Sequence, residues 1–203
     1  APGSWLQVAA KLVGPEGVVV GIDLNLVEGN FRQDNIHLIQ GDLREITRED
    51  LMAPLHEKKG SGVFLSKRKK TPDPFKYQVV LSDMAPDTMG DQTTDHHRSV
   101  RLCRALLERL GELLGKGGNC VIKVFEGEAY PELLAQVRGV FNKAKGFKPK
   151  ASRNESREMY IIAHGFTGTN AIANTDDASD DLPDQSIELP KRKPSKGWGE
   201  KRS

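Results

Sequence analysis

Short apolar runs alternate with amphipathic stretches from the start of the chain to about residue 167. Five of the runs are rich in β-branched or aromatic residues and lie beside Gly, Pro, Asn or Asp, which predicts strands. These runs cover residues 18–23, 36–42, 77–83, 119–125 and 159–166. Because they are apolar on both faces, they indicate a covered and mainly parallel sheet.

Apolar residues recur with helical spacing between these runs. Three such stripes predict helices whose apolar faces pack in the core. The stripes are Trp5, Val8, Ala9 and Leu12; Val100, Cys103, Leu106, Leu107, Leu110, Leu113 and Leu114; and Leu133, Leu134, Val137, Val140 and Phe141. Strands and helices in this alternation predict an α/β fold of the doubly wound type.

The alternating pattern ends near Gly168, which predicts one domain over residues 1–167 and a tail over 168–203. The tail has few large apolar residues, and acids up to Pro190 give way to bases from Lys191. Such a composition cannot bury enough apolar area to offset the entropy of ordering, so we expect disorder. A solvated tail that aids solubility is the favoured interpretation, with an RNA-contacting or targeting tail as the alternative.

Composition excludes several classes of protein. The 203 residues carry a net charge of only +2 and two cysteines, Cys103 and Cys120. Neither a disulfide framework nor a metal site is expected from that cysteine count. No apolar run approaches the ~20 residues of a membrane helix, so no membrane association is expected. The cysteine usage fits a reducing compartment, and a bacterial cytoplasm is the expected location, with the mitochondrion as the alternative.

Polar side chains stand at or near the ends of successive predicted strands. Asp23, Asp42 and Asp83 close three of them, and Lys123 lies within the fourth. In open α/β sheets, ligands bind beyond the carboxyl ends of the strands. Each Asp alone is explained by a helix cap or a turn. Together with the lysine, they predict one shared cleft.

Lys123 is the sharpest single signal in the chain. Lysine is depleted in strands and is rarely buried without a partner, yet Lys123 lies between Ile122 and Val124. The side chain either faces outward or forms an active-site pair with Asp83. We favour the pair, because Asp83 ends a strand and is followed by a turn that contains Pro86.

The chain opens with a turn of small residues that leads into a helix, at residues 1–5 (APGSW). Such a turn normally follows a strand, and Gly allows a ligand to approach the backbone closely. We therefore expect a first strand upstream of Ala1, missing from this chain. Asp23, some 20 residues later at a strand end, makes the segment similar to a nucleoside-binding βαβ unit.

The motifs together resemble the FtsJ/RrmJ ribosomal RNA 2′-O-methyltransferases. They are residues 1–5, Asp23, 40–42 (QGD), 82–86 (SDMAP), 122–127 (IKVFEG) and 156–158 (SRE). Their order matches that of the family. So do the 40 residues from Asp83 to Lys123 and the 35 from Lys123 to Glu158. The resemblance implies a class I, Rossmann-like fold with an antiparallel last strand.

The resemblance also implies S-adenosylmethionine as cofactor, and it implies site residues. Gly3 and Trp5 would lie beside the methionine part of the cofactor, Asp23 at its ribose, and Asp42 at its adenine. Asp83 would hold the methionyl amine. The catalytic set of the family is Lys-Asp-Lys-Glu, for which this chain offers Asp83, Lys123 and Glu158. The first Lys is expected upstream of Ala1.

The implied function is methylation of a ribose 2′-oxygen in ribosomal RNA, on a uridine of 23S-type RNA within the large subunit, by a monomeric enzyme. Lys123 is either a base or a cationic guide for the oxygen. The expected RNA surface is basic: Lys143, Lys145, Lys148, Lys150, Arg153 and Arg157. Alternatives are a tRNA or mRNA-cap 2′-O-methyltransferase and a catalytically silent RNA-binding assembly protein. A dehydrogenase is less favoured, since the full G-x-G-x-x-G motif is absent.

Overall fold

The computed structural model describes residues 3–25, 31, 33–57, 76–149 and 157–169. The predicted tail lies outside these residues from residue 170 on. The sequence also predicts a loop at 56–74 that carries four consecutive bases at 67–70. It lies outside the described residues except for residues 56 and 57, which end a helix. Every helix in the described part of the chain is too short or too polar to cross a membrane.

All five predicted strands are present in the structure, together with the three predicted helices. The elements are α1 (Ser4–Val13), β1 (Val19–Asp23), β2 (Ile36–Gln40), α2 (Arg48–Glu57), β3 (Tyr77–Ser82), α3 (Gln92–Leu113), β4 (Leu114–Phe125), α4 (Tyr130–Val140), β5 (Phe141–Phe147) and β6 (Glu158–Phe166). The sequence pattern missed α2, which contains Pro54, and β5, whose apolar residues are few.

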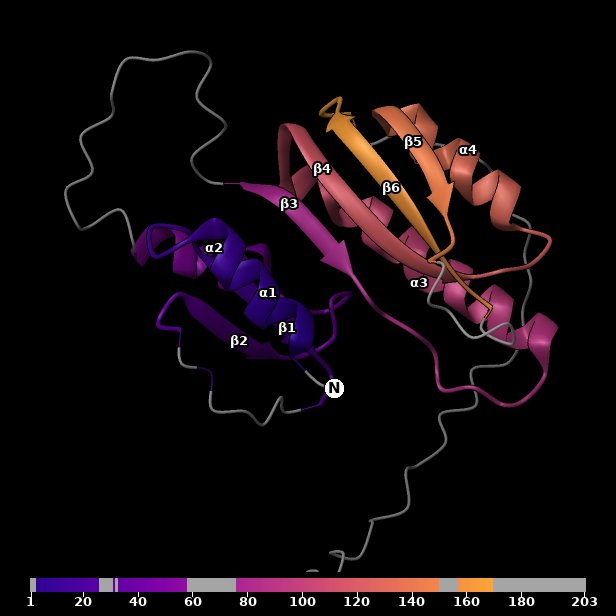
Figure 1. The fold of residues 1–203 in the computed structure, drawn as a ribbon, viewed down its shortest axis with the longest axis horizontal. Helices are drawn as coiled ribbons and strands as arrows, with labels where there is room; N and C mark the ends of the chain where they lie inside the picture. Colours follow the sequence, from indigo (N-terminus) through magenta and orange to yellow (C-terminus); the bar gives the residue numbers. More distant parts are fainter. Residues whose placement is uncertain (1–2, 26–30, 32, 58–75, 150–156, 170–203) are drawn as a thin grey trace, which may run out of the picture. The chain divides into compact units, whose positions relative to one another are not determined.

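The strands form a parallel pair, β1–β2, and a four-stranded sheet in the order β3-β4-β6-β5 (Figure 1). β3 and β4 are parallel, whereas β6 is antiparallel to both β4 and β5. The predicted α/β architecture with an antiparallel last strand is therefore confirmed. Among the described residues, no strand pairs with the second edge of β1 or of β3.

Helices α3 and α4 cover one face of the four-stranded sheet and enclose the main core (Figure 1). Alternate residues of β4 and β6 point into this core: Ile122, Val124, Ile161 and Ala163 are each 0% exposed. On the helices, Leu110 and Leu133 are likewise fully buried. The other face of the sheet, on which Lys123 lies, is thus separated from the helices by one layer of backbone.

A second, smaller core joins α2 to the strands. Leu51 and Met52 of α2 pack with Leu113 of α3 and with partly buried residues of β1, β2 and β3. The Tyr77 hydroxyl donates a hydrogen bond to the Leu51 carbonyl, and burial raises the pKa of Tyr77 to about 12. The missed helix α2 therefore supplies apolar side chains that close this core.

The prediction that the stripe of α1 packs in the core is wrong. Val8 and Leu12 are 57% and 82% exposed. Helix α1 meets β1 through a different residue, Leu6, whose side chain lies directly over Gly21, where a Cβ would clash with it. The predicted stripe instead lines an open apolar groove; its residues Trp5, Val8, Ala9 and Leu12 share that groove with Ser4 and Leu81.

Two helix boundaries differ from the prediction by one residue. Leu114 and Phe141 were placed on helical stripes, but both are extended and begin β4 and β5. Each remains buried in the main core, so the apolar pattern runs on across the change of backbone conformation. Helical spacing cannot locate the boundary because the same core receives the last turn and the first strand residue.

These packing differences predict unequal effects on stability. Leu133→Ala should lower the free energy of unfolding by about 2–5 kcal/mol, because it opens a cavity under the sheet. Leu12→Ala is the matched control and should change it by less than about 0.5 kcal/mol. Chemical denaturation of both variants measures the two values. A loss of more than about 2 kcal/mol for Leu12→Ala would contradict the open groove.

Candidate active site

The carboxyl ends of β3 and β4 meet the first residue of β6 at one edge of the sheet. Asp83 directly follows β3, Lys123 lies two residues before the end of β4, and Glu158 opens β6. The register places Ser82 beside Ile122 and Phe125 opposite Glu158. The strand order β3-β4-β6 therefore puts one carboxylate on each side of the lysine.

The three side chains converge as predicted. Lys123 Nζ lies 2.8 Å from Asp83 Oδ1 and 3.7 Å from Glu158 Oε1. The lysine side chain is only 9% exposed, whereas the side chains of Asp83 and Glu158 are 51% and 42% exposed. An enclosed amine is thus held between two carboxylates that solvent can reach, an arrangement suited to moving a proton between a bound hydroxyl and water.

Helix α3 fixes the backbone around Lys123 from the opposite face. The Cys103 thiol donates to the Lys123 carbonyl at 3.3 Å, and the Phe125 N–H donates to Ser99 Oγ at 3.0 Å. Burial raises the pKa of Cys103 to about 12, so the thiol stays protonated and able to donate. Lys123 is thereby anchored by its main chain as well as by its ion pairs.

His96 is a positioning residue that sequence reasoning missed. Its ring is 1% exposed; Nδ1 donates to the Phe125 carbonyl at 2.8 Å, and Nε2 accepts from the Ala129 N–H at 3.0 Å. Gly127 lies on this ring so closely that a Cβ would come within 2.3 Å of it. The ring therefore holds the loop after β4 through hydrogen bonds at both of its nitrogens. The available signal was its place on the core face of α3, one turn before Val100.

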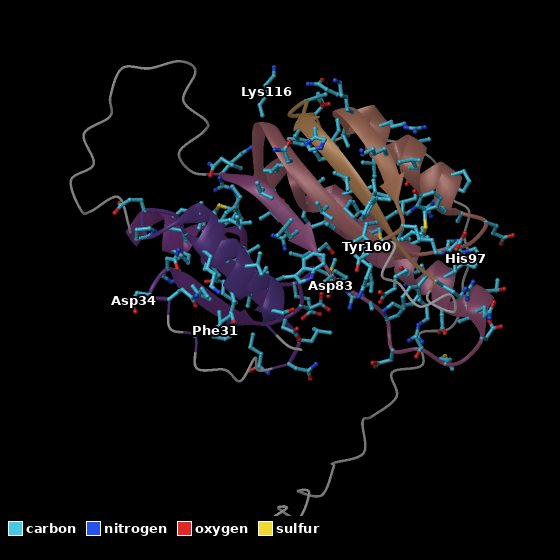
Figure 2. All side chains as sticks on the ribbon, in the orientation of Figure 1. Phe31, Asp34, Asp83, His97, Lys116 and Tyr160 are labelled. Atoms are coloured by element: carbon cyan, nitrogen blue, oxygen red, sulfur yellow. The ribbon has the colours of Figure 1, made fainter. Side chains whose placement is uncertain are left out.

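Tyr160 is a second residue that the sequence did not single out. It pairs with Lys123 across β4 and β6, and its ring lies 6.1 Å from that of Trp5, centroid to centroid. Burial, followed by the negative charges of Glu158 and Asp83, raises the pKa of Tyr160. Figure 2 shows Tyr160 near Asp83, at the end of β3. Trp5, which the sequence did predict as a site residue, thus lies at the edge of the triad formed by Asp83, Lys123 and Glu158.

The remaining predicted cofactor residues lie at turns. Gly3 precedes α1 with φ +83°, a left-handed conformation that favours glycine. Asp23 accepts a hydrogen bond from the Asn25 N–H, and Asp42 accepts from both the backbone and the guanidinium of Arg44. These bonds lower the pKa of Asp42. The Gly41 N–H donates to the Asp23 carbonyl, which joins the ends of β1 and β2.

The predicted RNA surface divides into two kinds of base. Lys148 pairs with Glu126 at 2.8 Å, and Arg157 donates to the Glu126 carbonyl. Lys143 and Lys145 are exposed, and within the described ranges neither forms an ion pair. Lys150 and Arg153 lie outside the described residues. Of the predicted bases that the structure describes, the two lysines of β5 are therefore the ones free for phosphate contacts.

Among the residues that the structure describes, no group of three His, Cys, Asp or Glu side chains could hold a metal ion. The acidic strand ends, the glycine turn before α1 and the lysine between two carboxylates form the site instead. This fold and site together define an α/β methyltransferase domain.

The family follows from comparison with known proteins. The model of the FtsJ-like methyltransferase family matches residues 1–166, and the chain belongs to that family. A crystal structure of a Plasmodium falciparum protein, described as a ribosomal RNA methyltransferase, matches with a TM-score of 0.63 at 23% identity. The match covers 83% of each chain and shows the shared fold.

Similar curated proteins carry the name ribosomal RNA large subunit methyltransferase E. That of Methanococcus maripaludis strain S2 is 38% identical over 175 residues, which is 86% of this chain and 61% of the relative. That of Halorubrum lacusprofundi is 38% identical over 82% of this chain and 55% of the relative. That of Desulfatibacillum aliphaticivorans is 36% identical over 85% and 73%. The chain thus spans about three fifths of the length of the archaeal relatives.

The surroundings of Tyr160 predict its titration. A difference titration at 295 nm, wild type minus Tyr160→Phe, should show that the pKa of Tyr160 lies above its usual value of about 10. Glu158→Gln should lower this pKa by removing a nearby negative charge. The value should stay above 10, because burial is the larger cause. A Tyr160 phenol that titrates at or below 10 in the wild type would contradict the described packing.

Proposed function

We propose that the protein transfers a methyl group from S-adenosylmethionine to a ribose 2′-oxygen of large-subunit ribosomal RNA. The observation that carries the proposal is the buried Lys123 amine between Asp83 and Glu158, at the edge of the sheet where strand ends form ligand sites. Membership of a methyltransferase family supports the reaction class. The names of the relatives support the choice of RNA.

The residues present fit the proposed cofactor. The left-handed Gly3 before α1 leaves the backbone open to close approach, and the start of α1 carries N–H groups without helical partners. Carboxylates at the ends of β1, β2 and β3 offer acceptors for the hydroxyl and amine groups of such a molecule. In the proposed assignment Asp23 holds the ribose, Asp42 the adenine edge and Asp83 the methionyl amine. Gly3 and Trp5 flank the methionine part.

The bound cofactor would supply an electrophilic methyl group, so the protein has to position the ribose and manage one proton. Lys123 Nζ is the group proposed to contact the 2′-oxygen, because its position is fixed by two carboxylates and by its own backbone. With the cofactor bound, transfer would break its methyl–sulfur bond, join the methyl group to the 2′-oxygen and release the hydroxyl proton. The Lys123 ammonium would pass one of its own protons to the half-exposed Glu158 carboxylate and take up the hydroxyl proton in its place. Glu158 would then release its proton to water.

This role predicts a selective loss of catalysis. Lys123→Ala in the protein at its natural full length should lower kcat at least about a hundredfold, because it removes the group that holds the oxygen and its proton. The Kd for S-adenosylmethionine should change less than about threefold. Lys116→Ala, a change in β4 but far from the carboxyl edge, is the matched control and should behave as wild type (Figure 2).

The acceptor decides between the proposed substrate and the alternatives. Tritiated methyl incorporation should occur with large-subunit ribosomal RNA and should vanish when the target nucleotide is 2′-deoxy. Incorporation into tRNA or capped mRNA alone would replace the proposed substrate. Binding of cofactor and RNA without transfer to any acceptor would identify a catalytically silent binding protein.

The two kinds of base predict how RNA binding depends on salt. Lys143→Gln with Lys145→Gln should weaken RNA binding and reduce the slope of log Kd against log salt by about one to two, because each free ammonium displaces about one counterion. Lys148→Gln is the control and should change the slope less, since Glu126 already neutralises that ammonium. Fluorescence anisotropy from 50 to 300 mM KCl measures the slopes. An equal effect of Lys148→Gln would contradict the distinction.

A further inference from the structure

A row of side chains crosses the sheet at the level of the buried amine. Lys123 of β4 faces Tyr160 of β6, and Tyr160 in turn faces Phe147 of β5. Residues directly opposite each other on neighbouring strands project to the same face. Two strand spacings separate the backbones of Lys123 and Phe147, a span of about 10 Å. An aromatic ring thus stands on the same surface as the triad, one strand beyond Tyr160.

The neighbours of Phe147 establish which face it occupies. Ala144 and Met159 pack into the core under α3 and α4, and a Cβ on Gly146 would clash with the Tyr130 hydroxyl of α4. Phe147, one residue from Gly146, therefore points away from the helices. It is 47% exposed, although the other face of its edge strand, β5, packs against the core. A single exposed Phe is common, so the informative feature is that Phe147 lies in one row with Lys123 and Tyr160.

The charge along β5 complements an anionic partner. Lys143 and Lys145 precede Phe147 at alternate positions of the strand and lie on the same face, opposite His164 and Ile162. Both are exposed and, in the described part of the chain, unpaired. An exposed aromatic ring with cations at strand spacing suits single-stranded nucleic acid, whose bases stack on the ring while its phosphates meet the cations. This charge favours RNA over an apolar protein partner.

We propose that Phe147 is a stacking platform for an unpaired nucleobase beside the nucleotide whose ribose meets Lys123. Lys145 and Lys143 would guide the phosphates that lead away from the site. The inference rests on the proposed function and adds a subsite to it: the substrate must present its target in an unpaired segment. With about 10 Å between the backbones of Lys123 and Phe147, Phe147 is too far from the reacting ribose and suits the base of a neighbouring nucleotide.

The test uses the protein at natural length and an RNA fragment that the wild type methylates. Phe147→Ala and Phe147→Leu should each raise Kd and KM for this RNA about fivefold to fiftyfold, within the range for loss of one base–aromatic stack. Both variants should leave kcat and the Kd for S-adenosylmethionine near the wild-type values. Phe147→Trp should stay within about twofold of wild type, and RNA should quench the new indole. Leu38→Ala, which truncates an exposed apolar residue of β2, is the control.

Abasic probes distinguish a base stack from a structural effect. Removal of one base next to the target should raise the Kd of the wild type by the same factor as Phe147→Ala does, and it should not raise the Kd of Phe147→Ala further. If every abasic position raised the Kd of Phe147→Ala by the same factor as that of the wild type, the proposal would be overturned. Wild-type affinity in Phe147→Leu, or self-association that Phe147→Ala abolishes, would also overturn it. If the wild type methylates no RNA, the proposed function fails alone. Anisotropy with a single-stranded RNA that the protein binds, made abasic at one position at a time, then tests the stack without any need for methylation.

Discussion

The pairing of one buried amine with two carboxylates is the constraint on which the carboxyl edge of this sheet depends. Transfer of an unpaired ammonium group into a protein interior costs several kcal/mol even after relaxation. Lys123 avoids that cost because Asp83 and Glu158 reach it from the strands on either side. Without the parallel neighbour β3 and the antiparallel neighbour β6, the lysine would have no partner for its charge.

Register makes this constraint strict. In β4 the residues beside Lys123, Ile122 and Val124, point to the opposite face and are fully buried under the helices. A shift of one residue would turn the ammonium toward the apolar core and expose the two aliphatic side chains. The packing of α3 and the chemistry of the edge therefore select the same register. The hydrogen bonds from Cys103 and to Ser99 strengthen that selection, since they fix the main chain at Lys123 and Phe125.

Sequence reasoning found those features whose signal is local. A lysine inside an apolar strand and an aspartate at a strand end can be recognised one segment at a time, and their convergence follows from the topology of parallel strands. The core role assigned to the α1 stripe was wrong, because periodicity predicts an apolar face but not what covers it. Leu12 is 82% exposed although it belongs to a regular stripe. The roles of Gly3, Trp5, Asp23 and Asp42 toward a cofactor stay predictions.

The missed features depend on pairing between distant segments. β5 has two exposed lysines and one glycine among seven residues, a composition that predicts no strand until β6 is known to lie beside it. His96 looks like any helical residue until the Phe125 carbonyl and the Ala129 N–H are found at its two ring nitrogens. Tyr160 gains its meaning from its register with Lys123. In each case the function of the side chain is set by a partner 13 or more residues away in sequence.

The same dependence changes how the basic residues should be interpreted. In the sequence, the bases from Lys143 to Arg157 form one cluster. In the structure, however, Lys148 and Arg157 both bind Glu126. Glu126 belongs to the loop after β4, which His96 also contacts. Those two bases therefore stabilise the loop after β4 and so the end of the strand that carries Lys123. The lysines of β5 are exposed and, among the described residues, form no ion pair. The surface proposed to bind RNA and the residues that hold the loop after β4 thus alternate along one stretch of sequence, and the ion pairs tell them apart.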